Sequence, residues 1–195
     1  MNINEQVTRR LVSRQSRLFD CPIVGLYQVS VDEANVAMHE WGHQLGECHR
    51  PFHQEAFSLQ LGERPLAYAI SASIVNGPVG PQGGSVSYGR TEVVELARLV
   101  ASEPWANRVM LRLWRETCAR LWPCWPVKAA VSYSHNGMHT GDLYRFDGWE
   151  RWRTDAGSTG GGTWGRKRSN TEAVYGKKTL WGWRYGTQQE EGSDE

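Results

Sequence analysis

Residues 91–122 restrict the choice of fold more than any other part of the chain. Residues 91–101, with the sequence TEVVELARLVA, are rich in β-branched and other apolar side chains, a pattern typical of a buried central strand. A short turn over residues 102–107 follows. The apolar spacing over residues 109–122 then predicts a helix that ends before Pro123. A strand that leads into a helix in this way favours a mixed α/β sheet over a helical bundle or an all-β fold.

The flanking segments extend this sheet. Their apolar patterns predict further strands, with a hairpin turn at residues 62–65. Asp32 is placed to cap a helix over residues 33–41, and Gly148 ends a short helix over residues 140–146. The remaining predicted strands cover residues 21–31, 55–61, 66–75, 128–134, 149–153 and 179–185.

One domain accounts for most of the 195 residues. We expect this domain over residues 21–186, a polar extension over residues 1–20 and an acidic disordered tail over residues 187–195. No window approaches the ~20 apolar residues that span a bilayer, and no secretory signal is visible. We therefore expect a cytoplasmic protein without a membrane partner. The four cysteines show no C-x-x-C spacing, which indicates reduced, mainly structural thiols.

The net charge of +1 conceals an uneven distribution. Residues 145–186 carry nine basic and four acidic side chains, whereas residues 1–144 are neutral overall. This pattern indicates either a polyanionic partner or a solvated basic face. Basic residues interleaved with aromatic ones suit contact with nucleic-acid phosphates and stacking on bases. The candidate DNA-binding residues are Arg151, Arg153, Arg166, Lys167, Arg168, Lys177 and Lys178.

Two segments resemble the GNAT acyltransferases: VVELARLVASEPWANRVMLRLW and HTGDLYRFDGW. The resemblance implies a mixed, mostly antiparallel central sheet flanked by helices. It also implies that the first strand diverges from its neighbour and binds the pantetheine arm of acetyl-CoA or another acyl-CoA. The next helix start, with amide donors near residues 106–109, then receives the pyrophosphate. Tyr144 matches the general acid that protonates the departing thiolate. The implied cofactor-binding residues are Leu96, Ala97, Leu99, Val100, Asn107 and Arg108.

The Gly-rich pyrophosphate loop of that superfamily, Q/R-x-x-G-x-G/A, is absent, because residues 102–108 contain no glycine. The series E-L-x-R-L, S-Y and H-x-G-x-x-Y is similar to the Mom family of phage DNA-modification proteins. Those proteins convert adenine in DNA to an acetamido derivative with acetyl-CoA, and iron is implicated. The resemblance implies roles for Arg98, Tyr144 and one of His49 or His53. The family's aspartate before the late helix has no match, because Ser134 or His135 occupies that region.

Arg98 stands out within the predicted central strand. A buried guanidinium is costly unless it is paired. Glu95 is three residues away and, by strict strand alternation, points to the opposite face of the sheet. We therefore expect Arg98 to contact a ligand or a different acid, and we assign it a role in organising the site.

The histidines of the early region are spaced as two H-x-x-x-H pairs, His39 with His43 and His49 with His53. Such spacing on a helix suits metal binding, although loop histidines without a metal remain the alternative. His49 and His53 are the preferred ligands if a metal, by the resemblance iron, is bound. In the late region, His139 is the preferred catalytic histidine because it begins the helix of Tyr144, and Ser134 is a further candidate.

Three hypotheses follow. The first is a phage-type acyltransferase that modifies a DNA nucleobase, adenine or a modified base, in the host cytoplasm. The second is a GNAT N-acetyltransferase of a small amine or a protein, and the third is a non-catalytic GNAT-like domain that binds nucleic acid or a host protein.

Trp181 and Trp183 share one strand face and are expected to be packed. A flat hydrophobic surface rich in Trp would equally serve as a homodimer contact.

Overall fold

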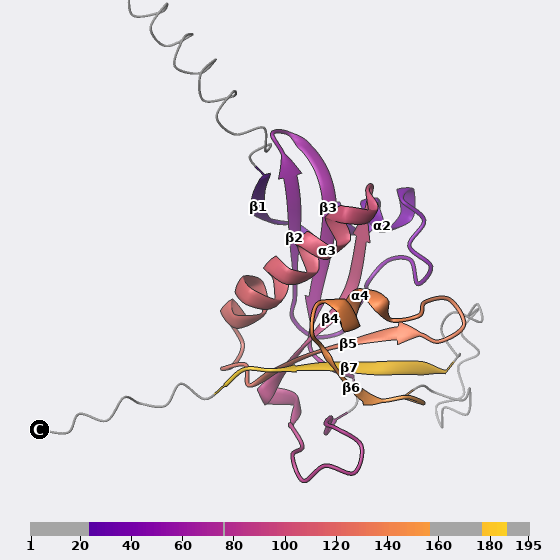
Figure 1. Ribbon diagram of the computed structural model, residues 1–195. Coiled ribbons are helices and arrows are strands. Elements are labelled where there is room, and N and C mark those ends of the chain that lie inside the picture. Colours follow the sequence, from indigo (N-terminus) through magenta and orange to yellow (C-terminus); the bar gives the residue numbers. More distant parts are fainter. Residues whose placement is uncertain (1–23, 76, 157–176, 187–195) are drawn as a thin grey trace, which may run out of the picture.

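The computed structural model describes residues 24–75, 77–156 and 177–186, which form one seven-stranded sheet (Figure 1). The strand order is β1-β2-β3-β4-β5-β7-β6. Neighbouring strands are antiparallel except β4 and β5, which are parallel. The predicted α/β class, with a mixed and mostly antiparallel sheet, is confirmed. The strands are β1 (Val24–Val29), β2 (Gln54–Leu61), β3 (Arg64–Ala72), β4 (Val93–Ala101), β5 (Ala129–His135), β6 (Glu150–Arg153) and β7 (Lys178–Arg184).

Helices cover both faces of this sheet. On one face, α2 (Val31–Glu40) buries Met38 against Tyr68 and Ile70 of β3. On the other face, α3 (Pro104–Leu113) continues through a π turn (Trp114–Cys118) and a 3₁₀ turn (Ala119–Leu121). The short helix α4 (Asp142–Phe146) lies on the same side as α3, and a 3₁₀ turn (Arg90–Glu92) precedes β4. Each face of the sheet therefore has its own apolar core, and the predicted flanking helices are confirmed.

Two of the predicted local details are wrong. Ser30, not Asp32, caps α2, because its hydroxyl accepts from the Glu33 amide at 3.0 Å and the helix begins at Val31. The β2–β3 turn consists of residues 62 and 63 alone, and Gly62 takes a positive φ of 60° there.

The helix after β4 begins earlier than the sequence predicts. Pro104 takes its first position, where a missing N–H costs nothing, so the expected turn at residues 102–107 shrinks to residues 102 and 103. Prolines are helix starters as well as helix breakers, and the apolar spacing alone did not distinguish the two roles. The α-helix ends at Leu113, and the predicted helix end near Trp122 comes only after the π and 3₁₀ turns.

A β-bulge interrupts β4. Ile70 pairs with Arg98 and the next residue of β3, Ser71, pairs with Leu96, which leaves Ala97 as an extra residue. The extra residue reverses the alternation of side chains beyond it. Val94 and Leu96 before the bulge, and Leu99 and Ala101 after it, all pack into the core beneath α3.

The parallel strands β4 and β5 pair only at their beginnings. Their register runs from Val93 opposite Ala129 to Leu96 opposite Ser132, and it stops there although both strands continue. The predicted divergence of the central strand from its neighbour is therefore present, and the two strands point in different directions beyond that pair (Figure 1).

The chain ends, the possibility of a membrane-spanning helix and the state of the cysteines were also predicted from the sequence. The predicted N-terminal extension and acidic tail lie outside the described residues. Within the described ranges, no helix has both the length and the apolar character needed to cross a membrane. Of the cysteines in that part of the chain, Cys48 and Cys118 are buried free thiols and Cys124 is an exposed one.

Candidate active site

A cleft of about 720 Å³ occupies the opening between β4 and β5. Its walls are the diverging strand ends, at residues 96–101 and 132–135. The loop after α2 closes one side with residues 41–45, and the start of α3 and residues 138–146 close the other. Beyond Leu96, the edge of β4 that faces β5 has no partner strand in the described part of the chain. Apart from the Ala97 carbonyl, which accepts from Arg98, its backbone groups can therefore pair with an extended ligand, as a sheet edge does.

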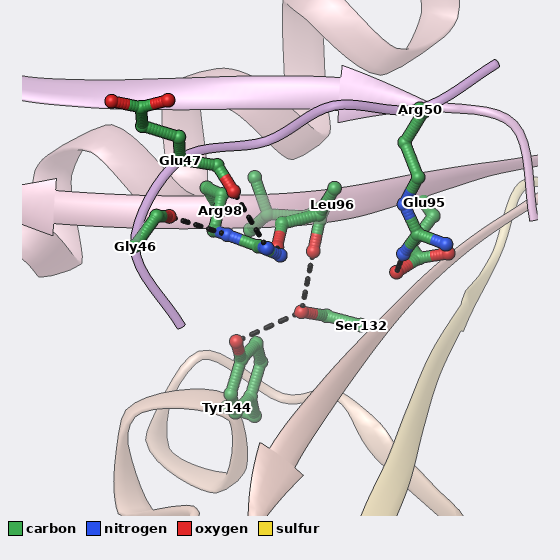
Figure 2. Close-up of polar contacts among 9 residues, drawn as sticks. Gly46, Glu47, Arg50, Glu95, Leu96, Arg98, Ser132 and Tyr144 are labelled. Carbon is green, nitrogen blue, oxygen red and sulfur yellow. Dashed lines mark hydrogen bonds and ion pairs between the residues drawn. The ribbon is translucent and has the colours of Figure 1, made fainter. Parts of the chain in front are cut away.

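A chain of hydroxyl groups lies where the strands separate (Figure 2). Ser132 Oγ donates to the Leu96 carbonyl at 3.0 Å, and the Tyr144 hydroxyl lies 2.9 Å from the same Oγ. Ser132 has a single hydroxyl proton, and that proton points to Leu96. The Tyr144 hydroxyl is therefore the donor to Ser132. The sequence favours Ser134, but its oxygen accepts from the Trp181 indole at 2.9 Å, and Ser132 is the serine that contacts the tyrosine.

Two indoles hold the ring of Tyr144. It stacks on Trp181 at 5.7 Å between ring centroids and meets Trp149 edge-on at 5.5 Å. Gly141 precedes the helix with a φ of 77°, and a β-carbon there would overlap the Trp181 ring. Burial raises the pKa of the Tyr144 phenol above its usual value. The phenol is therefore protonated at neutral pH and held in one orientation.

Arg98 lies on the opposite wall, facing the loop after α2. Its guanidinium donates to the carbonyls of Gly46 at 2.9 Å, Glu47 at 3.1 Å and Ala97 at 2.7 Å (Figure 2). The expected partner was a ligand or a different acid, but the hydrogen bonds that Arg98 makes within the described residues go to backbone oxygens. The predicted geometry is wrong, because the bulge places Glu95 and Arg98 on the same face of the sheet.

Glu95 itself is buried and pairs with Arg50 of the same loop at 2.6 Å (Figure 2). Burial raises the pKa of the Glu95 carboxyl, while Arg50 and Arg98 oppose that shift. The two arginines therefore tie the loop to β4 in different ways. Arg50 reaches from the loop to a strand side chain, and Arg98 reaches from the strand to loop carbonyls.

Comparison with known proteins identifies this architecture. The chain matches no model of a known protein family, and no curated protein matches it in sequence. Among solved structures, it is similar to the ribosomal-protein-S18-alanine N-acetyltransferase from Escherichia coli. That match has a TM-score of 0.55 and 10% identity, and it covers 87% of this chain and 99% of the other.

The chain has the GNAT acetyltransferase fold. A second similar structure is Arabidopsis thaliana NAA60 in complex with acetyl-CoA, with a TM-score of 0.52 and 7% identity over 83% of this chain and 98% of that one. A third is a probable acetyltransferase from Staphylococcus epidermidis, with a TM-score of 0.53 and 8% identity over 84% and 100%. At this level of identity the likeness concerns the fold, and the residues of the cleft must carry the argument about function.

The start of α3 lies at the cleft, but its backbone amides are less available than the sequence predicts. We expected free amides near residues 106–109, but the amides from Asn107 onward lie inside α3, where helix hydrogen bonds use them. The side chains of Asn107 and Arg108 nevertheless line the cleft. The expected strand residues Leu96, Ala97, Leu99 and Val100 line it as well.

The early histidine that reaches the cleft is His43 rather than His49 or His53. His49 pairs with Glu47 at 2.7 Å and is mostly exposed, and the imidazole of His53 lies against Trp122. Neither lines the cleft. Among the described residues, no three His, Cys, Asp or Glu side chains are grouped to hold a metal ion. The pairing of His49 and His53 as ligands therefore gains no support.

Three imidazoles line the cleft: His43, His135 and the predicted His139. His43 is half-buried, and its Nδ1 accepts from the Leu45 amide at 3.2 Å, so the ring proton lies on Nε2. His135 Nδ1 accepts from the Gly137 amide, and its buried Nε2 has no partner in the described part of the chain. The Nε2 atoms of His43 and His135 are therefore the ring nitrogens that can donate a hydrogen bond.

Lowering the pH is expected to destabilise the fold through His43. Burial, and then the electrostatic effects of the neighbouring Arg98 and His139, lower the His43 pKa from 6.5 to about 4. A histidine with a depressed pKa contributes stability above its unfolded pKa and loses it as the pH falls through the folded pKa. We expect the urea midpoint to fall between pH 6.5 and pH 4, and His43→Gln to flatten that fall. An unchanged pH profile in His43→Gln would contradict this assignment.

The predicted DNA-binding residues are only partly described. Arg151 and Arg153 are exposed on β6, Lys177 pairs loosely with Asp155 at 3.7 Å, and Lys178 is half-buried. Burial, together with Arg98, lowers the pKa of the Lys178 ammonium. Residues 166–168 lie outside the described residues. Trp181 and Trp183 pack in the core beneath α3, as predicted.

Proposed function

We propose that this protein transfers an acyl group from acyl-CoA to a nitrogen acceptor, with Tyr144 as the general acid. The observation that carries the proposal is the position of the Tyr144 hydroxyl. It lies at the point where β4 and β5 separate, joined through Ser132 to the Leu96 carbonyl. An acyl-CoA whose pantetheine arm pairs with the free edge of β4 would have its thioester beside this phenol.

The proton balance of the reaction is simple. The acceptor nitrogen attacks the thioester carbonyl, the C–S bond of the resulting intermediate breaks, and the products are an amide and the CoA thiol. Tyr144 gives its proton to the leaving sulfur and regains one from the acceptor nitrogen. Ser132 can turn its hydroxyl from the Leu96 carbonyl to the phenolate while the proton is absent. The phenolate is then stabilised by a hydrogen bond at the moment it forms.

The acceptor that we propose is a nucleobase in DNA, adenine or a modified base, as the Mom-like motifs imply. The exposed Arg151 and Arg153 of β6 support this choice, because cations attract a polyanion. A base must leave the duplex to enter an enzyme cleft. The proposal includes no iron step, because the described histidines form no ligand set.

A protein or small-amine acceptor is the second candidate. The similarity in fold to an N-acetyltransferase of a ribosomal-protein alanine favours it. This candidate needs no basic surface outside the cleft. The two candidates are therefore distinguished by the acceptor and share the same acyl-CoA chemistry.

The test is nucleoside mass spectrometry of plasmid DNA from cells that express the protein, beside a Tyr144→Phe culture. A mass adduct that is present with the native chain and absent with the variant would support DNA modification and identify base and acyl group together. Isothermal titration with acetyl-CoA runs in parallel. CoA binding without an adduct would exclude the nucleobase acceptor in that host and favour the amine, and absence of CoA binding would overturn the whole proposal.

A further inference from the structure

The rim of the cleft between α3 and α4 carries an exposed aromatic ring that lies near two cations. The side chain of Phe146, at the end of α4, is 63% exposed. The Arg145 guanidinium lies 4.7 Å from the centre of its ring and the Arg108 guanidinium lies 5.8 Å from it. Phe146 and Arg108 both line the cleft. Because most of Phe146 is exposed, it contributes little to the core, and its ring lies at the cleft.

Arg108 is a free cation. It is exposed, and among the described residues no carboxylate lies within ion-pair distance of it. Arg145 pairs with Asp142 at 2.8 Å, but both side chains are about half exposed or more, at 64% and 48%, and such a pair exchanges readily with another anion. This rim therefore offers two guanidinium groups to a ligand that is both anionic and planar.

The backbone at the start of α3 offers little to an anion. Pro104 has no N–H, and the Ala106 amide already donates to the Glu103 carbonyl at 3.0 Å. Trp105 alone supplies a free amide among the first three helical positions. The Glu103 carboxylate also lies at the helix start, where it repels an anion. With no glycine in residues 102–108, the chain cannot wrap a loop of amides around a phosphate.

We propose that Arg108, Phe146 and Arg145 bind the nucleotide end of the acyl donor, with the guanidinium groups on its phosphates and the phenyl ring stacked on its adenine. This inference rests on the proposed function. Side chains would thus bind the phosphates that the amides of a Gly-rich loop bind in GNAT acyltransferases. Guanidinium groups bind phosphate in a bidentate manner, and an aromatic ring can stack on any base. The consequence is selectivity for a nucleotide-borne acyl group over one carried on pantetheine alone.

The test compares the affinities of CoA, 3′-dephospho-CoA and pantetheine by isothermal titration. The variants are Arg108→Gln, Arg145→Gln and Phe146→Ala. Arg112→Gln is the matched control, because Arg112 is one turn further along α3 and outside the cleft. Each rim variant is expected to raise the CoA dissociation constant about tenfold and to leave pantetheine unchanged, since charged hydrogen bonds and base stacking each contribute about this much. Arg108→Gln should also reduce the salt dependence of CoA binding.

The outcomes separate the two proposals. If native protein and rim variants bind CoA equally, the nucleotide site is wrong while acyl-CoA binding stands. If the native protein binds pantetheine as tightly as CoA, the site is again wrong. If it binds neither ligand, the proposed function falls as well. Thermal unfolding of each variant checks that the fold is retained, which is expected because all three side chains lie on the surface.

Discussion

Replacement of Tyr144 by phenylalanine is expected to lower the turnover number for acyl transfer about 100-fold, with little change in the KM for acyl-CoA. A positioned general acid contributes roughly 10²- to 10⁴-fold, and only the leaving of the thiolate needs the lost proton. The ring would keep its contacts with Trp149 and Trp181, so the fold and the cleft should persist. The measurement is the rate of CoA thiol release with DNA present as acceptor.

Ser132→Ala is the control for that experiment. It removes the hydroxyl that lies 2.9 Å from the phenol but leaves the phenol in place. We expect a loss of about tenfold, the value of one hydrogen bond to a charged group. Because burial raises the pKa of Tyr144, activity should show no loss from phenol ionisation below pH ~10. A Tyr144→Phe protein that keeps more than half of the native rate would remove the tyrosine from the mechanism.

Much of the fold could be predicted because its signals are local and periodic. The apolar run of β4, the apolar spacing of α3 and the turn glycines each follow from side chains within a few residues. The details that failed depend on contacts between distant segments. The bulge at Ala97 exists only relative to β3, and without it Glu95 and Arg98 would lie on opposite faces. Nothing in the sequence of β4 alone marks the extra residue.

In the candidate site, too, residues with a local sequence signal were predicted and residues that depend on distant contacts were not. Tyr144 and Arg98 were identified because a motif or an isolated buried charge marked them. His43 and Ser132 were missed, since their importance comes from where a loop and a strand end meet. The available signal for Ser132 was its place in the series S-Y-S (residues 132–134), where it shares a strand face with Ser134. For His43, no local signal separated it from three other histidines in the same region.

Arg115 is expected to make the largest single contribution to stability among the ionic groups at the α4 end of the molecule. Its side chain is 2% exposed and pairs with Asp147, 10% exposed, at 2.9 Å. The guanidinium also lies 3.6 Å from the centre of the Trp183 ring. This pair joins the π turn after α3 to the residue that ends α4, the helix that carries Tyr144. Without Arg115, the Asp147 carboxylate keeps only the exposed Arg112 as a cation partner among the described residues. Breaking a buried ion pair by removing one partner costs about 3–5 kcal/mol.

Arg115→Ala should therefore lower the free energy of unfolding by about 3–5 kcal/mol, measured by urea unfolding with Trp fluorescence. Arg112→Ala is a matched control on the same carboxylate, because Arg112 meets Asp147 at 3.4 Å but is 68% exposed. Exposed pairs contribute at most about 1 kcal/mol, so this variant should unfold near the native midpoint. The double variant Arg115→Met with Asp147→Asn should recover part of the loss, because it removes both charges and retains an acceptor for the Trp149 indole. Equal destabilisation by Arg115→Ala and Arg112→Ala would mean that burial does not govern this pair, and that α4 is held by its apolar contacts with Trp149 and Trp181 alone.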